Sequence, residues 1–184
     1  NMTINTFDDI PAVNDRDTHG KRIYHKVFLL KEDDVNYSRL PAIDDSARTC
    51  EEFVFKANAD GWKCFSYVRN TLEDTSESSK GDITSTVTNT FSGTLGGSRP
   101  VIDRFIENHQ GDNFFIGYID IYSGKKYILG RPYSPMQLTA FKRLNGKDSA
   151  SCDTTFTNES FFQPLEYLGN FPLNPEDDGI GSEE

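Results

Sequence analysis

The stretch that decides the fold reads Asp82-Ile83-Thr84-Ser85-Thr86-Val87-Thr88-Asn89-Thr90-Phe91-Ser92-Gly93-Thr94-Leu95. Every even position from 84 to 94 carries a hydroxyl residue, and the odd positions carry all four apolar side chains. Successive side chains of a strand point to opposite faces, so a period of two predicts one long β-strand with a hydrophilic face and a mixed face. The strand exceeds the usual five or six residues, and we expect it to project beyond a compact sandwich or to curve round a barrel.

Upstream of this strand the chain predicts three more strands. Residues 22–31 are rich in β-branched and aromatic side chains and indicate a buried strand. Residues 52–56 and 62–68 are strand-like runs, and residues 58–61 between them predict a hairpin connection. Residues 70–81 are almost wholly polar and show no periodicity, so we expect a long exposed loop there.

Downstream the pattern changes once to a helical period and then returns to strands. Residues 98–110 predict a helix, with Ser98 as its cap and an apolar face made by Val101, Ile102, Phe105 and Ile106. Residues 114–122 and 125–129 predict one hairpin, and residues 137–144 and 151–161 predict another. The last segment again places polar residues on one face: Ser151, Asp153, Thr155, Thr157 and Glu159. The predicted fold class is mainly β, an antiparallel sandwich or barrel with one flanking helix and a long exposed loop.

The charge of the chain lies mostly at its ends. The formal net charge is −10, with 19 Lys and Arg against 29 Asp and Glu. Residues 175–184 hold five acids and no base, residues 1–20 hold four acids and one base, and residues 21–174 hold 20 acids and 18 bases. We therefore expect an acidic arm at 1–20, a single domain at 21–171 and an acidic tail at 172–184. The lack of a long basic run argues against a protein that grips phosphates.

Other classes of protein find little support in the sequence. No stretch approaches the length of an apolar membrane span, and the first residues do not read as a secretory signal. Cys50, Cys64 and Cys152 are an odd, sparse set, which indicates reduced thiols in a reducing compartment. The three histidines have no ligand-type spacing, and residues 15–20 begin like a calcium loop that then fails at its later positions. We expect no catalytic, metal or cofactor site.

The order of these elements resembles the tail-tube (major tail) proteins of long-tailed bacteriophages, whose fold is shared more distantly by the inner tubes of contractile injection systems. The resemblance covers about residues 21–171 and lies in the order and pattern of elements, since no short diagnostic motif is present. It implies a non-enzymatic virion protein, assembled in the host cytoplasm, whose subunits form stacked hexameric rings around a DNA-conducting lumen. The implied partners are further copies of the chain and other tail proteins, with no membrane and no sequence-specific contact to DNA.

The resemblance also assigns two groups of residues. A lumen-facing strand surface would comprise Thr84, Thr86, Thr88, Thr90, Ser92, Thr94, Asp153, Thr155, Thr157 and Glu159. A loop reaching the next ring would comprise residues 70–81, with Leu72, Glu73, Asp74, Glu77 and Lys80. Two alternatives stay open. One is another virion protein, such as a tail terminator, neck or decoration protein. The other is a β-sandwich binding module for carbohydrate or protein that uses exposed aromatics such as Trp62, Tyr122, Tyr127 and Tyr133.

Overall fold

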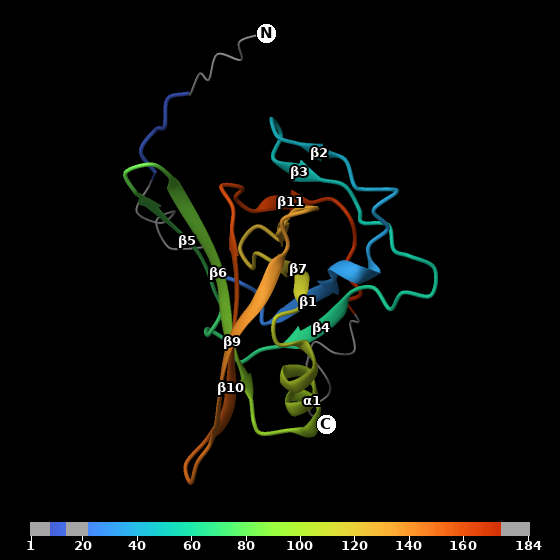
Figure 1. Ribbon diagram of the computed structural model, residues 1–184, viewed down its shortest axis with the longest axis vertical. Coiled ribbons are helices and arrows are strands. Elements are labelled where there is room, and N and C mark those ends of the chain that lie inside the picture. The colour runs from blue at the N-terminus through green and yellow to red at the C-terminus, as the bar shows by residue number, and fades with distance from the viewer. Residues whose placement is uncertain (1–7, 14–21, 174–184) are drawn as a thin grey trace.

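The computed structural model describes residues 8–13 and 22–173, and Figure 1 shows their arrangement. Within these residues, eleven strands and one α-helix make up a β-sandwich with a flanking helix, which confirms the predicted fold class. The strands are β1 (Lys26–Lys31), β2 (Ile43–Asp44), β3 (Thr49–Cys50), β4 (Lys63–Ser66), β5 (Glu73–Lys80), β6 (Ser85–Gly96), β7 (Asn113–Ile119), β8 (Lys126–Leu129), β9 (Met136–Asn145), β10 (Ala150–Glu159) and β11 (Leu165–Tyr167). The helix is α1 (Pro100–His109), and a short 3-10 turn, η2 (Glu32–Asp34), follows β1.

The first layer of the sandwich is centred on β1 and β7, which pair antiparallel. β4 lies on the outer side of β1, and β8 extends the layer from β7 towards β11, β3 and β2. β1 is buried on both faces: Val27 and Leu29 enter one apolar cluster, and Phe28 and Leu30 enter another. This double burial explains why residues 27–30 are apolar without alternation.

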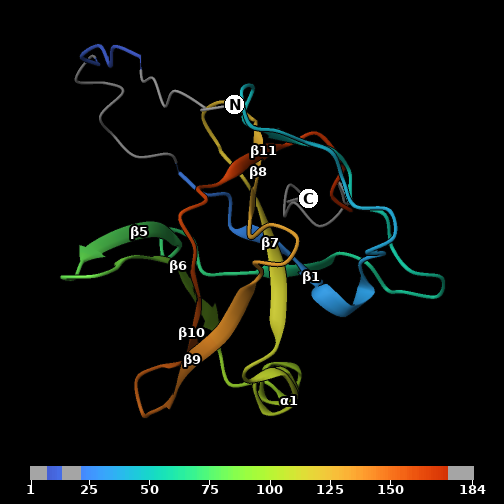
Figure 2. The ribbon, with the colours of Figure 1, turned by 45° about the horizontal axis from the view of Figure 1, so that its top comes forward.

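The second layer contains four antiparallel strands in the order β9-β10-β6-β5. It joins the first layer where Phe114 of β7 pairs with Met136 of β9. Phe91 and Leu95 of β6 and Phe156 of β10 point into the core between the layers. The β5–β6 hairpin extends beyond that core, as Figures 1 and 2 show.

The helix covers one end of the core. Ile102 and Ile106 are buried against the strands, and Phe105 packs edge-on against Phe65 of β4 with ring centroids 4.8 Å apart. The N-cap residue is Arg99, without a side-chain cap bond, so the prediction of a Ser98 cap is wrong. The Ser98 hydroxyl instead accepts a hydrogen bond of 2.7 Å from Arg143 on β9.

The predicted hairpin around residues 58–61 does not form. β4 pairs with β1, more than 30 positions away in the chain, through Val27 opposite Phe65 and Phe28 opposite Cys64. Residues 52–56 contribute only a single bridge, from Phe55 to Val35. The buried strand β1 offers β4 a complete ladder, and this tertiary pairing overrides the local turn signal at Asn58 and Gly61.

Residues 70–81 are exposed as predicted, but they are not an irregular loop. Glu73–Lys80 form β5, which pairs with β6 along its whole length, from Glu73 opposite Ser92 to Lys80 opposite Ser85. Both faces of β5 are polar because both meet solvent over most of the strand. A strand of this kind has no hydrophobic alternation by which sequence reasoning can recognise it. The long hydroxyl-bearing strand itself is confirmed as β6, which begins at Ser85.

Candidate assembly surface

The hydroxyl row of β6 and the polar row of β10 lie side by side on one face of the second layer. The antiparallel register places Thr88 opposite Glu159, Thr90 opposite Thr157, Ser92 opposite Thr155 and Thr94 opposite Asp153. Two rows predicted separately, about sixty positions apart in the chain, therefore form one continuous surface. Of the ten predicted residues, only Thr84 lies outside the strands, in the turn before β6.

The outer strands extend this surface on both sides. Glu73, Thr75, Glu77 and Ser79 of β5 face the hydroxyl row, opposite Ser92, Thr90, Thr88 and Thr86. On β9, Lys142 stands opposite Asp153, and Thr139 bonds to Thr157 with 3.1 Å between the hydroxyl oxygens. The pairing between β9 and β10 shifts by one residue between Thr155 and Phe156 of β10, and no pattern in the sequence predicts this bulge. We call the combined surface of β5, β6, β10 and β9 the hydroxyl face.

The hydroxyl face carries an excess of negative charge. Its carboxylates are Glu73, Glu77, Asp153 and Glu159, and its cation is Lys142. Four carboxylates against one ammonium give the face a net charge of −3. Asp153 accepts a 2.6 Å hydrogen bond from the Thr94 hydroxyl, which holds this carboxylate against the neighbouring strand β6. Most of the remaining side chains are neutral hydroxyl and amide groups that interact well with water, and Ala140 and Leu144 of β9 are apolar.

The other face of β6 carries Asn89 and Gly93, whose contacts determine how β6 lies against its neighbours. Gly93 has no room for a side chain, because a Cβ there would lie 2.5 Å from Leu72 and 2.7 Å from Tyr67. Asn89 is buried and ties three segments together: it donates to Asn158 at 2.8 Å and to the Ser160 carbonyl at 2.9 Å, and it accepts from Ser76 at 2.6 Å. These contacts fix the register of β6 against both of its neighbours.

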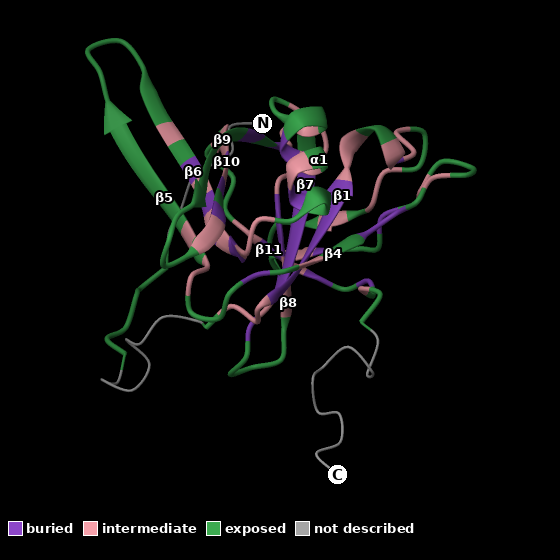
Figure 3. Cartoon of the chain, turned by 90° about the horizontal axis from the view of Figure 1, so that it is seen from below, coloured by how far each residue is buried: buried purple, intermediate pink, exposed green. Residues whose placement is uncertain are grey.

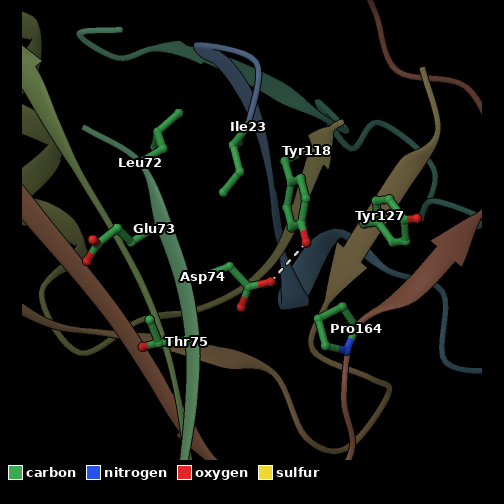
Figure 4. A pocket seen from close by; sticks show the side chains of 8 residues that line it. All are labelled: Ile23, Leu72, Glu73, Asp74, Thr75, Tyr118, Tyr127 and Pro164. Carbon is green, nitrogen blue, oxygen red and sulfur yellow. Dashed lines mark hydrogen bonds between the residues drawn. The ribbon is translucent and has the colours of Figure 1, made fainter. Parts of the chain in front are cut away.

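The predicted loop residues separate into three groups. Glu73 and Glu77 lie on the hydroxyl face, whereas Asp74 and Lys80 lie on the other face of β5. Leu72 is partly buried and packs against the core. Asp74 accepts a 2.9 Å hydrogen bond from the Tyr118 hydroxyl of β7, as Figure 4 shows. Burial and this carboxylate raise the pKa of Tyr118.

The Asp74–Tyr118 bond lies in a cavity of about 470 Å³ at the base of β5. Leu72, Glu73, Asp74 and Thr75 line one side of it, and Tyr118, Tyr127, Ile23 and Pro164 line the other (Figure 4). The cavity lies where the β5–β6 hairpin leaves the rest of the domain. The Asp74–Tyr118 bond therefore anchors the hairpin to the first layer.

The second layer has two edges without a strand partner in the described part of the chain. β5 pairs only with β6, and β9 has β10 on one side but meets β7 only at Met136 and Gln137. Residues 140–145 of β9 and residues 75–80 of β5 therefore present backbone groups without a strand partner along one side. Long open edges promote pairing with another chain, and natural monomers usually protect them.

The aromatic residues considered for a binding module do not share one exposed surface. Trp62 is buried, 7% exposed, among Phe53, Tyr167 and Phe171, so the expectation that it is exposed is wrong. Tyr127 is half-buried and stacks on Tyr118. Tyr122 and Tyr133 are exposed, in the turn after β7 and in the segment between β8 and β9.

Residues considered for chemistry have structural roles in the described ranges. His109 lies 2.8 Å from Asp112 at the end of α1. Among residues 8–13 and 22–173, no group of three His, Cys, Asp or Glu side chains could hold a metal ion. The calcium-like stretch at 15–20 and most of the acidic arm and tail lie outside the described residues.

Within those same ranges, no helix has the length and apolar character needed to cross a membrane. No protein-family model matches this chain, and no curated protein matches it either.

Proposed function

We propose that the protein is a structural, non-enzymatic subunit of a phage tail tube, in which copies of the chain form stacked rings around a lumen that conducts DNA. The observation that carries this proposal is the second layer, because it combines a polar, acidic face with two open edges. Hydroxyl groups and carboxylates keep the lumen hydrated, and the carboxylates repel DNA phosphates, so DNA would pass without adhering.

The direction of the strands favours pairing between copies. The four strands alternate in direction, so β5 and β9 run antiparallel to each other. When copies are related by rotation about one axis, β5 of one copy meets β9 of the next in an antiparallel arrangement. Such a contact joins two different edges, and repeating it around the axis closes a ring.

The stagger of the two edges supports a closed barrel. Through the register, the centre of β5 lies level with residues 88–89 of β6, and the centre of residues 140–145 lies level with residues 94–95. The offset is about six residues, or about 20 Å, across four strands that span about 19 Å. Copies at equal height therefore require a strand tilt of about 45°, which is close to the 35–45° of closed barrels.

The same geometry sets the size of the lumen. Each copy advances about 28 Å around the circumference, so six copies give a backbone diameter of about 53 Å. Side chains occupy about 5 Å on the inner face at each side, half the usual spacing between packed sheets, which leaves about 40 Å. A DNA duplex fits within this width.

The oligomeric state tests the proposal directly. Light scattering and negative-stain electron microscopy of the purified protein across a concentration series should show rings and tubes. Monomers that persist at high concentration would refute the proposal. Single rings that never stack would instead favour a tail terminator or neck protein.

A second experiment tests which face lines the lumen. Replacing Thr88 and Thr90 together by Lys should leave assembly possible and make the tubes retain DNA, with an affinity that falls steeply as salt rises. The matched control replaces Ile121, an exposed residue of the turn after β7, by Lys. Equal DNA retention by the control and the double variant would contradict the assignment of the hydroxyl face to the lumen.

A further inference from the structure

An apolar cavity lies between β4 and α1. Its volume is about 430 Å³, and its walls include Phe65, Leu95, Ile102 and Phe105. The two charged residues that line it, Lys63 and Arg99, are both basic. The cavity therefore suits an apolar group that carries a negative charge beside it.

The tip of the β5–β6 hairpin has this chemistry. The turn is closed by a hydrogen bond of 2.7 Å from the Gly81 amide to the Thr84 carbonyl, which presents Asp82 and Ile83 at the end of the hairpin. Ile83 is 97% exposed at the end of the hairpin, which Figure 3 shows as exposed over most of its length. An isoleucine in such a position meets only water in the subunit, and Asp82 places a carboxylate directly beside it.

The tip cannot reach the cavity of its own chain. Leu95 lines the cavity and lies on β6, twelve residues after Ile83, which lies in the turn before that strand. At about 3.3 Å per residue this separation is about 40 Å. Figure 1 shows the hairpin tip towards one end of the long axis and α1 towards the other. Occupation of the cavity by the tip therefore requires a second copy, displaced along the strands.

We infer that Ile83 of one copy inserts into the β4–α1 cavity of a copy in the adjacent ring, with Asp82 placed against Lys63 and Arg99. This inference rests on the proposed function and names the contact that stacks one ring on the next. Because the tip and the cavity are different surfaces at opposite ends, the contact repeats without closing and builds an open-ended stack. With the strand tilt of about 45°, the stacking repeat along the ring axis is then about 28 Å, the axial part of the length of about 40 Å that separates the two surfaces.

A cysteine that the chain already contains allows a chemical test of this contact. Cys64 is exposed and lines the cavity, whereas Cys50 and Cys152 are buried. A single Ile83→Cys variant should therefore form a disulfide with Cys64 of the adjacent copy when its assemblies are treated with a mild oxidant. Non-reducing electrophoresis should then show a ladder that continues beyond the number of subunits in one ring. The double variant Ile83→Cys, Cys64→Ser and the variant Ile121→Cys are the matched controls and should give no ladder.

The non-covalent counterpart is Ile83→Ser, with Ile121→Ser as its control. We expect Ile83→Ser to form rings normally but to need at least tenfold more protein to form tubes. If the Ile83→Cys variant forms rings but no tubes, this result supports the inference as the same result for Ile83→Ser does. Tubes of Ile83→Ser at the wild-type concentration, tubes of Ile83→Cys without a ladder, or a ladder that stops at one ring would overturn it. Each of these outcomes leaves the ring proposal standing, whereas a wild-type protein without rings refutes the proposed function itself.

Discussion

A proline at position 78 would separate hydrogen bonding within one copy of the chain from hydrogen bonding between copies in the proposed ring. The Gly81–Thr84 bond fixes which pairs of the β5–β6 ladder are hydrogen bonded. Because bonded and non-bonded pairs alternate along an antiparallel ladder, Ser79 and Glu77 bond to β6 and the amide of Ser78 points to the open edge. Ser78→Pro therefore removes no bond inside the subunit, and proline is tolerated at such an edge position.

The expected effect on assembly is large, because every interface of the proposed ring would contain the substituted edge. Loss of one backbone hydrogen bond costs about 1 kcal/mol at each contact, before any steric conflict with the proline ring is counted. For six contacts the loss is about 6 kcal/mol per ring, which corresponds to roughly a 10⁴-fold weaker assembly. The free energy of unfolding of the dilute, unassembled protein should change by less than about 0.5 kcal/mol.

Sedimentation velocity across a concentration series measures the assembly, and thermal unfolding of the dilute protein measures the fold. The matched control is Ser79→Pro, which removes an amide that bonds to β6 and should destabilise the hairpin itself. If Ser78→Pro forms rings at the same concentration as the wild type, the β5 edge is not an assembly edge. In that case the barrel geometry derived from the two edges is wrong.

Two further predictions concern the packing of the subunit. Gly93→Ala should destabilise the protein by about 1–3 kcal/mol in urea unfolding, because the new methyl group collides with Leu72 and Tyr67; an unchanged midpoint would contradict this. Burial raises the pKa of the Cys50 thiol to about 11, so alkylation of the native protein at pH 8 should label Cys64 and spare Cys50, as mass spectrometry can show. The stability due to the neutral Cys50 thiol is complete below its ordinary pKa near 9 and is lost as the pH rises through about 11.

The sequence predicted β6 well because one of its faces meets the core. Phe91 and Leu95 are buried while Ser92 and Thr94 are only partly covered, and this difference produces the period of two. The sequence also predicts the two downstream hairpins, because strand-like runs are joined by short turns in β7–β8 and β9–β10, although β7 is buried at five consecutive positions and shows no alternation. Local alternation followed by a turn is the signal that a single sequence preserves best.

Pairing between distant segments could not be predicted in the same way. β4 binds β1 rather than the segment before it, and nothing local in residues 62–68 specifies that partner. β5 was missed because Glu73, Asp74, Glu77 and Lys80 give both of its faces the same polar character. The alignment of the β6 row with the β10 row depends on a register that only the folded sheet defines.

The uneven distribution of charge in the folded domain reconciles its nearly neutral net charge with the proposed acidic lumen. The net charge of −10 comes largely from the two ends of the chain, and residues 21–174 are nearly neutral. A neutral body argues against an acidic lumen only if its charges are spread evenly. The register instead gathers Glu73, Glu77, Asp153 and Glu159 on one face with Lys142 as its cation, while the basic residues Lys63 and Arg99 line a cavity near α1. The proposed repulsion of DNA therefore depends on the register of four strands, and a one-residue slip between β6 and β10 would move Asp153 and Glu159 to the other face without changing the composition of the chain.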